Sequence, residues 1–222
     1  MKKIQHLIFS VLLISNLPAA DWPTWGGDAT RNMVSLETGL DFDFEPGEMN
    51  DDESVDMSTT KNIKWVAKLG SQAYGNVTIA NGRVFAGTNN ESPRDTGKKG
   101  DRGVVMCFNE KSGEIEWQLV IPKLGAGKVS DWEYIGVCSS PAIEGNRVYV
   151  VTNKCEVVCL DIEGFKNGND GPFMDEANYV KPKGTQDSLN EKLDADIIWM
   201  YDMRDQLGVF PHNVTSSSPL II

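Results

Sequence analysis

A 13-residue pattern occurs twice in the sequence, and it restricts the fold more than any other feature does. Residues 77–89 and 141–153 align with a constant offset of 64 residues. In each copy, a short β-rich run is followed by a polar turn containing Gly and Asn, and then by a second run of β-branched and aromatic residues. This arrangement is typical of a β-hairpin. The sequence therefore predicts two equivalent hairpins.

Further segments extend each hairpin to four strands. Third strands are expected at residues 104–109 and 156–161, and fourth strands that end in tryptophan are expected at Ile115–Trp117 and Ile197–Trp199. Two more segments look like parts of neighbouring units. They are Ile63–Trp65, which resembles a fourth strand, and Ser217–Ile222, which resembles an opening strand.

The spacing of the tryptophans is that of a β-propeller, whose blades have four strands and repeat about every 40 to 50 residues. Trp65 and Trp117 are 52 residues apart, and Trp117 and Trp199 are 82 apart, with the excess in one polar insertion. We expect an all-β fold, a β-propeller of four-stranded antiparallel blades, with about two and a half blades present. Because the pattern stops within a repeat, an N-terminal fragment of a longer protein is expected. An open antiparallel sheet is the alternative, since hairpins alone do not require a closed ring.

The first twenty residues have the pattern of a signal peptide. Lys2 and Lys3 precede a mostly apolar stretch at residues 4–17, and small residues follow before Asp21. The stretch is too short and too interrupted for a membrane span, which needs about 20 apolar residues. We expect export to the periplasm or the extracellular space. The predicted organisation is a signal peptide at 1–20, an N-terminal segment with an acidic loop at 21–62, and propeller repeats, incomplete at the C-terminus, at 63–222.

The chain is acidic, with 21 Lys and Arg against 32 Asp and Glu and a net charge of -11. This balance argues against nucleic acid as a partner, because phosphate contacts need clustered basic residues. Residues 41–56 hold eight acids and no base. The run Asp41-x-Asp43-x-Glu45 imitates the start of a calcium loop, but Pro46 stands where that loop needs a flexible Gly. A solvated acidic loop is favoured over a metal site.

No residue is nominated as catalytic, cofactor-binding or metal-ligating. After removal of the signal peptide, His212 is the only histidine, and its Pro-His-Asn context favours a loop residue over a catalytic base. The four cysteines permit three disulfide pairings in an exported chain, and the sequence does not choose between them. These cysteines are Cys107, Cys138, Cys155 and Cys159.

Residues 107–117 resemble the tryptophan-docking motif of the PQQ-like (quinoprotein-type) propellers, usually Ala-x-Asp-x-x-Thr-Gly-x-x-x-Trp. Cys107, Asn109 and Ser112 replace Ala, Asp and Thr and keep small size and side-chain acceptors. In this motif Gly113 allows a turn, and Trp117 offers a planar surface to the next blade.

The resemblance extends beyond this motif. Cys159-Leu160-Asp161 and Trp199 repeat it around the insertion. Residues 21–27 and 37–40 are similar to the N-terminal segment of secreted PQQ-like repeat proteins of the planctomycete type.

The insertion at residues 163–195 is rich in Gly, Asn, Asp and Lys and poor in β-branched residues. These features predict a long surface loop, which either binds a partner or is simply solvated. A solvated loop is the favoured interpretation.

The resemblance implies two function classes. One is a non-catalytic binding or scaffold protein of the cell envelope, with a protein or an envelope component as its partner and no cofactor. The other is a PQQ-dependent alcohol or sugar dehydrogenase, which would hold the quinone and calcium at the propeller axis. The alcohol dehydrogenases of this class carry an adjacent Cys-Cys pair, whereas Cys138 is followed here by two serines. One propeller fold hosts both uses, so the fold does not decide between them. We favour the binding class, because the residues typical of the enzyme are absent from this sequence.

Overall fold

A computed structural model describes residues 20–125, 131–182 and 184–222. The predicted signal peptide therefore lies, apart from Ala20, outside the described residues. Within these ranges, no helix has the length and apolar character needed to cross a membrane.

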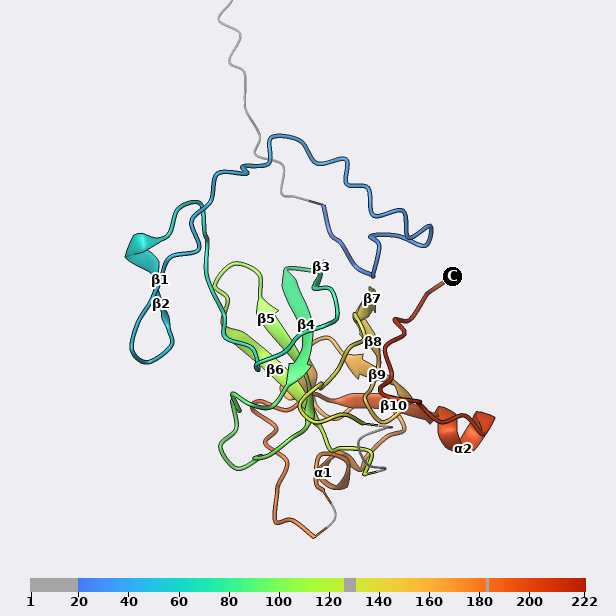
Figure 1. Ribbon diagram of the computed structural model, residues 1–222. Coiled ribbons are helices and arrows are strands. Elements are labelled where there is room, and N and C mark those ends of the chain that lie inside the picture. The colour runs from blue at the N-terminus through green and yellow to red at the C-terminus, as the bar shows by residue number, and fades with distance from the viewer. Residues whose placement is uncertain (1–19, 126–130, 183) are drawn as a thin grey trace, which may run out of the picture.

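Two four-stranded antiparallel sheets form the body of the molecule (Figure 1). The strands of each sheet lie side by side in the order in which they occur along the chain. The first sheet contains β3 (Thr78–Ala80), β4 (Arg83–Asn89), β5 (Gly103–Asn109) and β6 (Ile115–Ile121). The second contains β7 (Ala142–Glu144), β8 (Arg147–Val151), β9 (Glu156–Asp161) and β10 (Ile197–Asp202). Both predicted hairpins are present, and the predicted fold class, blades of an all-β propeller, is confirmed.

The two sheets also share their register. Trp117 on β6 lies opposite Cys107, and Trp199 on β10 lies opposite Cys159. In both sheets the register shifts just beside the tryptophan. The predicted ends of the fourth strands are wrong, because β6 and β10 continue past their tryptophans to Ile121 and Asp202. They continue because the third strands offer backbone partners for these residues as well.

The main core lies between the sheets, where every second residue of a strand points to the same face. Phe85, Trp117 and Leu119 of the first sheet and Val148 and Leu160 of the second belong to one buried cluster. The alternate residues of the first sheet form a second cluster on its other face. The members of that cluster are Val84, Val104, Met106, Phe108 and Val120.

The second cluster is covered by a segment that precedes the first sheet. Trp65, Ala67 and Leu69 pack against it at every second position. The prediction of strands at Ile63–Trp65 and at Ser217–Ile222 is wrong for the described chain. A strand requires a hydrogen-bonded neighbour, and no described strand pairs with either segment.

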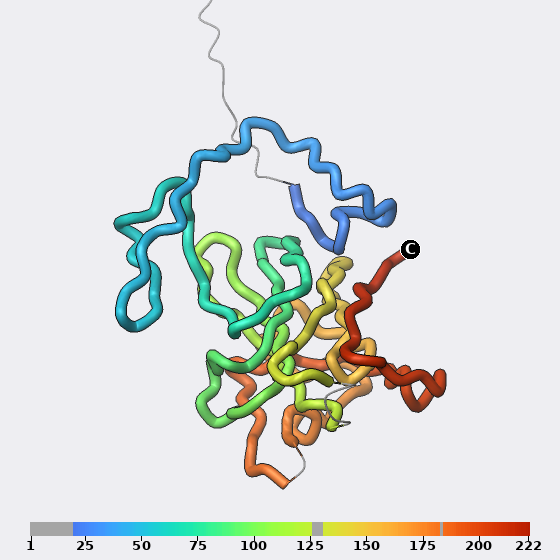
Figure 2. Tube along the Cα trace, in the orientation of Figure 1, coloured from blue at the N-terminus to red at the C-terminus, as the bar shows by residue number. Residues whose placement is uncertain are grey.

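The N-terminal segment contacts both sheets and then runs away from them (Figure 2). Trp22 exchanges two backbone hydrogen bonds with Ile79 on β3, and the amide of Ile143 on β7 donates to the carbonyl oxygen of Pro23 across 2.8 Å. The acidic loop forms a small hairpin of β1 (Glu48–Met49) and β2 (Val55–Asp56), followed by a 3-10 turn at Met57–Thr59.

The insertion is more ordered than a solvated loop. It contains a 3-10 turn at Gly164–Asn167 and the short helix α1 (Glu176–Tyr179), and α2 (Met203–Leu207) follows β10. Tyr179 and Val180 are buried in the main core. Near its end the insertion reaches the first sheet, where the amide of Gln118 on β6 donates to the carbonyl oxygen of Leu193 across 2.7 Å. The prediction of a simple surface loop is therefore wrong for these parts.

Candidate functional site

A cavity of about 610 Å³ lies beside the innermost strands of the two sheets. Three equivalent segments line it: residues 74–76, which precede β3, residues 138–140, which precede β7, and residues 216–218. The N-terminal segment contributes Trp25 and Arg31. In a propeller, the first strand of each blade borders the central axis. The cavity thus lies on the side of the two sheets where a propeller of this kind would have its axis, and we call it the axial cavity.

Hydrogen bonds between equivalent positions hold these segments together. The amide of Asn76 donates to Ser140 Oγ across 2.8 Å, and the amide of Ser140 donates to Ser218 Oγ across 3.0 Å. Asn76 and Ser140 are separated by 64 residues, the offset found in the sequence. One position per repeat thus binds the backbone of the preceding repeat, which fixes the spacing of the cavity wall.

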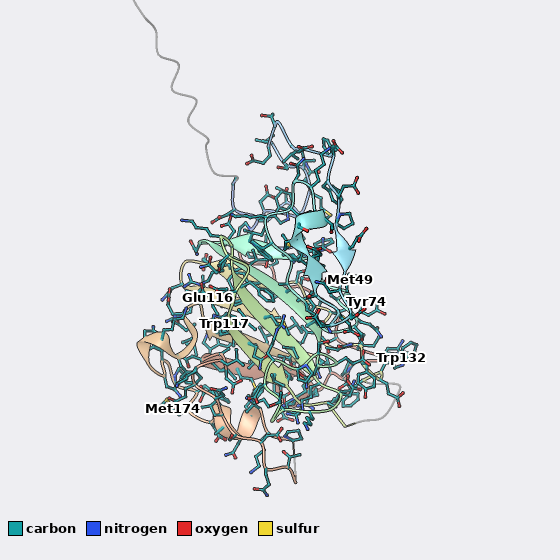
Figure 3. The ribbon with its side chains drawn as sticks, turned by 90° about the vertical axis from the view of Figure 1, so that its left-hand side faces the viewer. Met49, Tyr74, Glu116, Trp117, Trp132 and Met174 are labelled. Carbon is teal, nitrogen blue, oxygen red and sulfur yellow. The ribbon has the colours of Figure 1, made fainter. Side chains whose placement is uncertain are left out.

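Two aromatic side chains lie open at the rim of the axial cavity. Tyr74 is 61% exposed and Trp132 is 49% exposed, although both line the cavity. Figure 3 shows both on one side of the sheets, across from Glu116 on β6. The Tyr74 hydroxyl donates to Gln72 Oε1 across 2.9 Å, which restrains the ring. Exposed, restrained aromatic rings are typical of binding surfaces.

Arg31 closes the cavity on the side of the N-terminal segment. Its Nη2 donates to the carbonyl oxygens of Ser218 and Pro219, at 3.0 and 3.1 Å. Its guanidinium carbon lies 5.2 Å from the centre of the Trp25 ring, a cation–π contact. Arg31 thus joins residues separated by nearly the whole described chain, while its Nε is buried without a hydrogen-bond partner.

Cys138 lines the axial cavity as a neutral thiol. Burial first, and then the nearby charge of Asp131, raise its pKa to about 11, although Lys123 partly opposes both effects. Asp131 itself is engaged: its carboxylate pairs with Lys123 Nζ at 2.6 Å and accepts the amide of Leu124 at 2.7 Å. A thiol with this pKa is a poor nucleophile at neutral pH.

Apart from Cys138, the candidate residues singled out in the sequence lie outside the axial cavity. All four cysteines are free thiols, so none of the three disulfide pairings is present. His212 is exposed. In the acidic loop, Asp52 and Asp56 accept the amides of Ser54 and Ser58, and Asp43 pairs with Lys61. Within the ranges described, no group of three or more His, Cys, Asp or Glu is arranged to hold a metal ion.

The tryptophan-docking motif works as its residues predict. Asn109 Oδ1 accepts the amides of Lys111 and Ser112, and the Ser112 hydroxyl accepts the amide of Glu114. Gly113 has a φ of +74°, and a Cβ built on it would lie 2.5 Å from the Trp65 ring. The motif therefore receives the tryptophan that precedes the first sheet.

Sequence reasoning missed the second receiving turn. Asp161 Oδ1 accepts the amide of Glu163, and Gly164 has a φ of +61° with Trp117 packed against it. Part of the signal was present, because Asp161 follows Cys159 at the spacing at which Asn109 follows Cys107, although Gly164 comes one residue earlier than Gly113 does. It was obscured by the insertion that begins there. The axial cavity was also missed, although the 64-residue offset from Asn76 to Ser140 marks its wall.

Comparison with known families agrees with this architecture. The PQQ-like repeat family described as outer membrane protein assembly factor BamB matches residues 52–170, which is more than half of the chain. The match includes all of the first sheet and β7 to β9 of the second. No curated protein matches the chain significantly. The extent of the match and the two docking turns lead to one conclusion: this chain belongs to the PQQ-like repeat family of the outer membrane protein assembly factor BamB type.

Proposed function

We propose that the protein is an exported β-propeller of the cell envelope that binds another protein or an envelope component and catalyses no reaction. The observation that carries this proposal is the axial cavity with its two exposed aromatic rings. The partner would insert an apolar or aromatic side chain between Tyr74 and Trp132, while the polar wall of residues 216–218 bonds its backbone.

The chemistry of the axial cavity supports binding over catalysis. Aromatic residues at the centre of a contact supply a large share of its binding energy. Among the described residues of the lining, one side chain is charged: Arg31, which binds two carbonyl oxygens and the Trp25 ring and whose Nε has no hydrogen-bond partner.

A calcium-bound quinone does not fit this set of residues. Ca²⁺ takes six to eight oxygen ligands and favours carboxylates, and no Asp or Glu is among the described residues that line the cavity. PQQ is itself an anion with several negative charges, and Arg31 is the single basic side chain among the described residues of the lining. The dehydrogenase remains the alternative function.

Export rests on the sequence of residues 1–20 and on the name of the matched family, which refers to the outer membrane. We propose a periplasmic or extracellular location. The test is a fusion of residues 1–20 to mature alkaline phosphatase, an enzyme that is active only after export. Activity comparable to that of a known leader is expected, and a fusion with Lys2 and Lys3 replaced by Glu should be impaired. An inactive wild-type fusion would contradict export.

The binding role is tested with a photo-crosslinking amino acid placed at Trp132 in the full chain, expressed in its native envelope. We expect one discrete crosslinked partner that is lost when Tyr74 is replaced by Ala in the same protein. The control places the crosslinker at Met174, which is even more open to solvent than Trp132 and lies in the insertion. Equal crosslinking from both positions would overturn a role of the axial cavity.

The alternative is tested by adding PQQ and Ca²⁺ to the same protein and following dye reduction with primary alcohols and aldoses. Stoichiometric quinone uptake with turnover would replace the binding proposal by the dehydrogenase.

A further inference from the structure

A second cavity lies at another place between the two sheets, and we propose that it binds an anion that carries a phosphate group. Its volume is about 530 Å³. It is formed by the loop before β5, the residues after β6, the turn before β9, and α1 with the residues that follow it. We call it the basic cavity. It shares no lining residue with the axial cavity, so this site is independent of the proposed function.

The charge of the basic cavity is opposite to that of the chain. Five basic side chains and a single acidic one, Asp101, line it, in a protein whose net charge is -11. The basic residues are Lys99, Arg102, Lys123, Lys154 and Lys181. Four carboxylates contact these bases, those of Asp101, Asp131, Glu156 and Asp187, so the five bases leave one net positive charge at the site. A concave site focuses such a charge, which attracts anions.

Three of these bases already have carboxylate partners. Lys123 pairs with Asp131, Lys154 Nζ lies 2.9 Å from Glu156 Oε1, and Arg102 Nη1 lies 2.5 Å from Asp187 Oδ2. These ion pairs hold the walls of the basic cavity in place, but each is close to neutral and attracts an anion only weakly.

The other two bases are not paired. Lys99 and Lys181 have no ion pair with any residue that the structure describes, and both side chains reach solvent. Two ammonium groups without counter-charges therefore border one concave site, and they are the groups available to a ligand.

Arg102 holds these two lysines at the same site. Its side chain is buried, Nε donates to the carbonyl oxygen of Lys99 across 2.9 Å, and Nη1 donates to the carbonyl oxygen of Val180 across 3.4 Å. Val180 directly precedes Lys181. One rigid guanidinium thus joins the loop of the first sheet to the insertion of the second. The two lysines are brought together by the fold, although 82 residues separate them.

Uncharged groups complete a site suited to an oxyanion. Asn178 also lines the basic cavity; its Nδ2 donates one hydrogen to Asp175 Oδ1 across 2.6 Å and keeps a second for a ligand. The Thr185 hydroxyl donates to the carbonyl oxygen of Pro182 across 2.9 Å, so its oxygen can only accept. Lys154 Nζ lies 4.7 Å from the centre of the Tyr179 ring, so that ring provides an apolar floor beneath a positive charge. Phosphate oxygens accept several charge-assisted bonds at once. The volume leaves room for an organic group attached to the phosphate, in a soluble phosphomonoester or in a lipid headgroup.

The test compares the full chain with the variant Lys99→Gln/Lys181→Gln. Calorimetric titrations at constant ionic strength use glycerol 3-phosphate, with inorganic phosphate as a second probe. Flotation assays use vesicles of phosphatidylglycerol, with phosphatidylcholine vesicles as the neutral reference. The control variant, Lys111→Gln/Lys192→Gln, removes the same charge from two exposed lysines outside the basic cavity.

We expect saturable binding by the wild-type chain and by the control variant, and at least about tenfold weaker binding by the cavity variant. Binding of glycerol 3-phosphate would identify a soluble ligand, whereas binding of phosphatidylglycerol vesicles alone would identify a lipid headgroup. A single Lys99→Glu variant, changed at an exposed position, should weaken binding more than Lys99→Gln does. Equal losses in the cavity and control variants, or no saturable binding to either probe, would overturn the proposal.

Discussion

The indole nitrogen of Trp117 donates a hydrogen bond to the carbonyl oxygen of Ile162 across 2.9 Å. The indole nitrogen of Trp65 does the same to Glu110 across 2.8 Å, and both bonds span 45 residues. Trp65 therefore docks on the turn between the third and fourth strands of the first sheet. Trp117 docks on the residues that directly follow the third strand of the second sheet, where the insertion begins. The docked tryptophan is the element by which one repeat recognises the next.

Replacement of Trp117 by Ala should destabilise the chain by about 3 to 5 kcal/mol, because a large and almost fully buried side chain is lost together with its hydrogen bond. Trp199 occupies the same register but is 37% exposed, so Trp199→Ala should cost clearly less. Denaturant melts of the two variants measure the difference. Equal losses would contradict the assignment of Trp117 as the docked residue.

Replacement of Lys98 by Met should destabilise the chain by about 3 to 5 kcal/mol, because it leaves Asp194 as an unpaired buried carboxylate. Lys98 Nζ lies 2.8 and 2.6 Å from the two carboxylate oxygens of Asp194, and both side chains are buried. The double variant Lys98→Met/Asp194→Asn should recover much of this loss, since the side-chain oxygen of an asparagine at position 194 still accepts a hydrogen bond from the amide of Asn190. A double-mutant cycle from melts measures the coupling, and additive losses would show that the pair is not coupled.

Asp196 should make the stability of the chain depend on pH. Burial first, and then the charges of Glu176, Asp161 and Asp170, raise the pKa of its carboxyl from 3.8 to about 6. A hydrogen bond from the amide of Asp170 partly opposes this rise. A raised pKa means that the folded state holds the proton more tightly than the unfolded state. Its stabilising contribution is complete below about pH 4 and is lost as the pH rises through 6.

Asp196→Asn should therefore stabilise the chain at pH 8, on the order of 1 to 3 kcal/mol, and change it little at pH 4. Melts at the two pH values test this. A gain at pH 4 as large as that at pH 8 would rule out titration as the cause.

Cys138 should react slowly with iodoacetamide at neutral pH and about tenfold faster per pH unit above it, because only the thiolate reacts and its pKa is about 11. Mass spectrometry of the labelled protein measures the rate. Cys107 is buried, which raises its pKa still further, so it should be labelled only after unfolding. Rapid neutral labelling of Cys138 would show an activated thiol and would reopen a catalytic role for the axial cavity.

Local patterns in the sequence predicted the strands well. The Asn81–Gly82 turn has positive φ at both residues, as a tight hairpin requires, and the offset of 64 residues placed Gly145 correctly at the equivalent turn. The side chain of Asn81 even donates to the carbonyl oxygen of Gly145 across 2.9 Å. These features were accessible because turns and alternation depend on residues close together in the chain.

Contacts between distant segments were not accessible in this way. Nothing in the sequence around Arg31 indicates that it binds Ser218, 187 residues away, or that Arg102 joins Lys99 to Val180. Both cavities depend on such contacts. The composition of the insertion was misleading for the same reason, because a few buried residues such as Tyr179 decide its packing although most of its residues are polar.

The contact of residues 193–195 with β6 has a further consequence for solubility. β6 is the outer strand of its sheet, and the amide and carbonyl oxygen of Gln118 are both bonded by the insertion, to Leu193 and Ala195. An unprotected outer strand offers its backbone to any other chain and promotes aggregation. The insertion of one sheet thus protects the exposed edge of its neighbour, so a variant shortened by these residues would lose the buried Lys98–Asp194 pair and would also offer this edge for self-association.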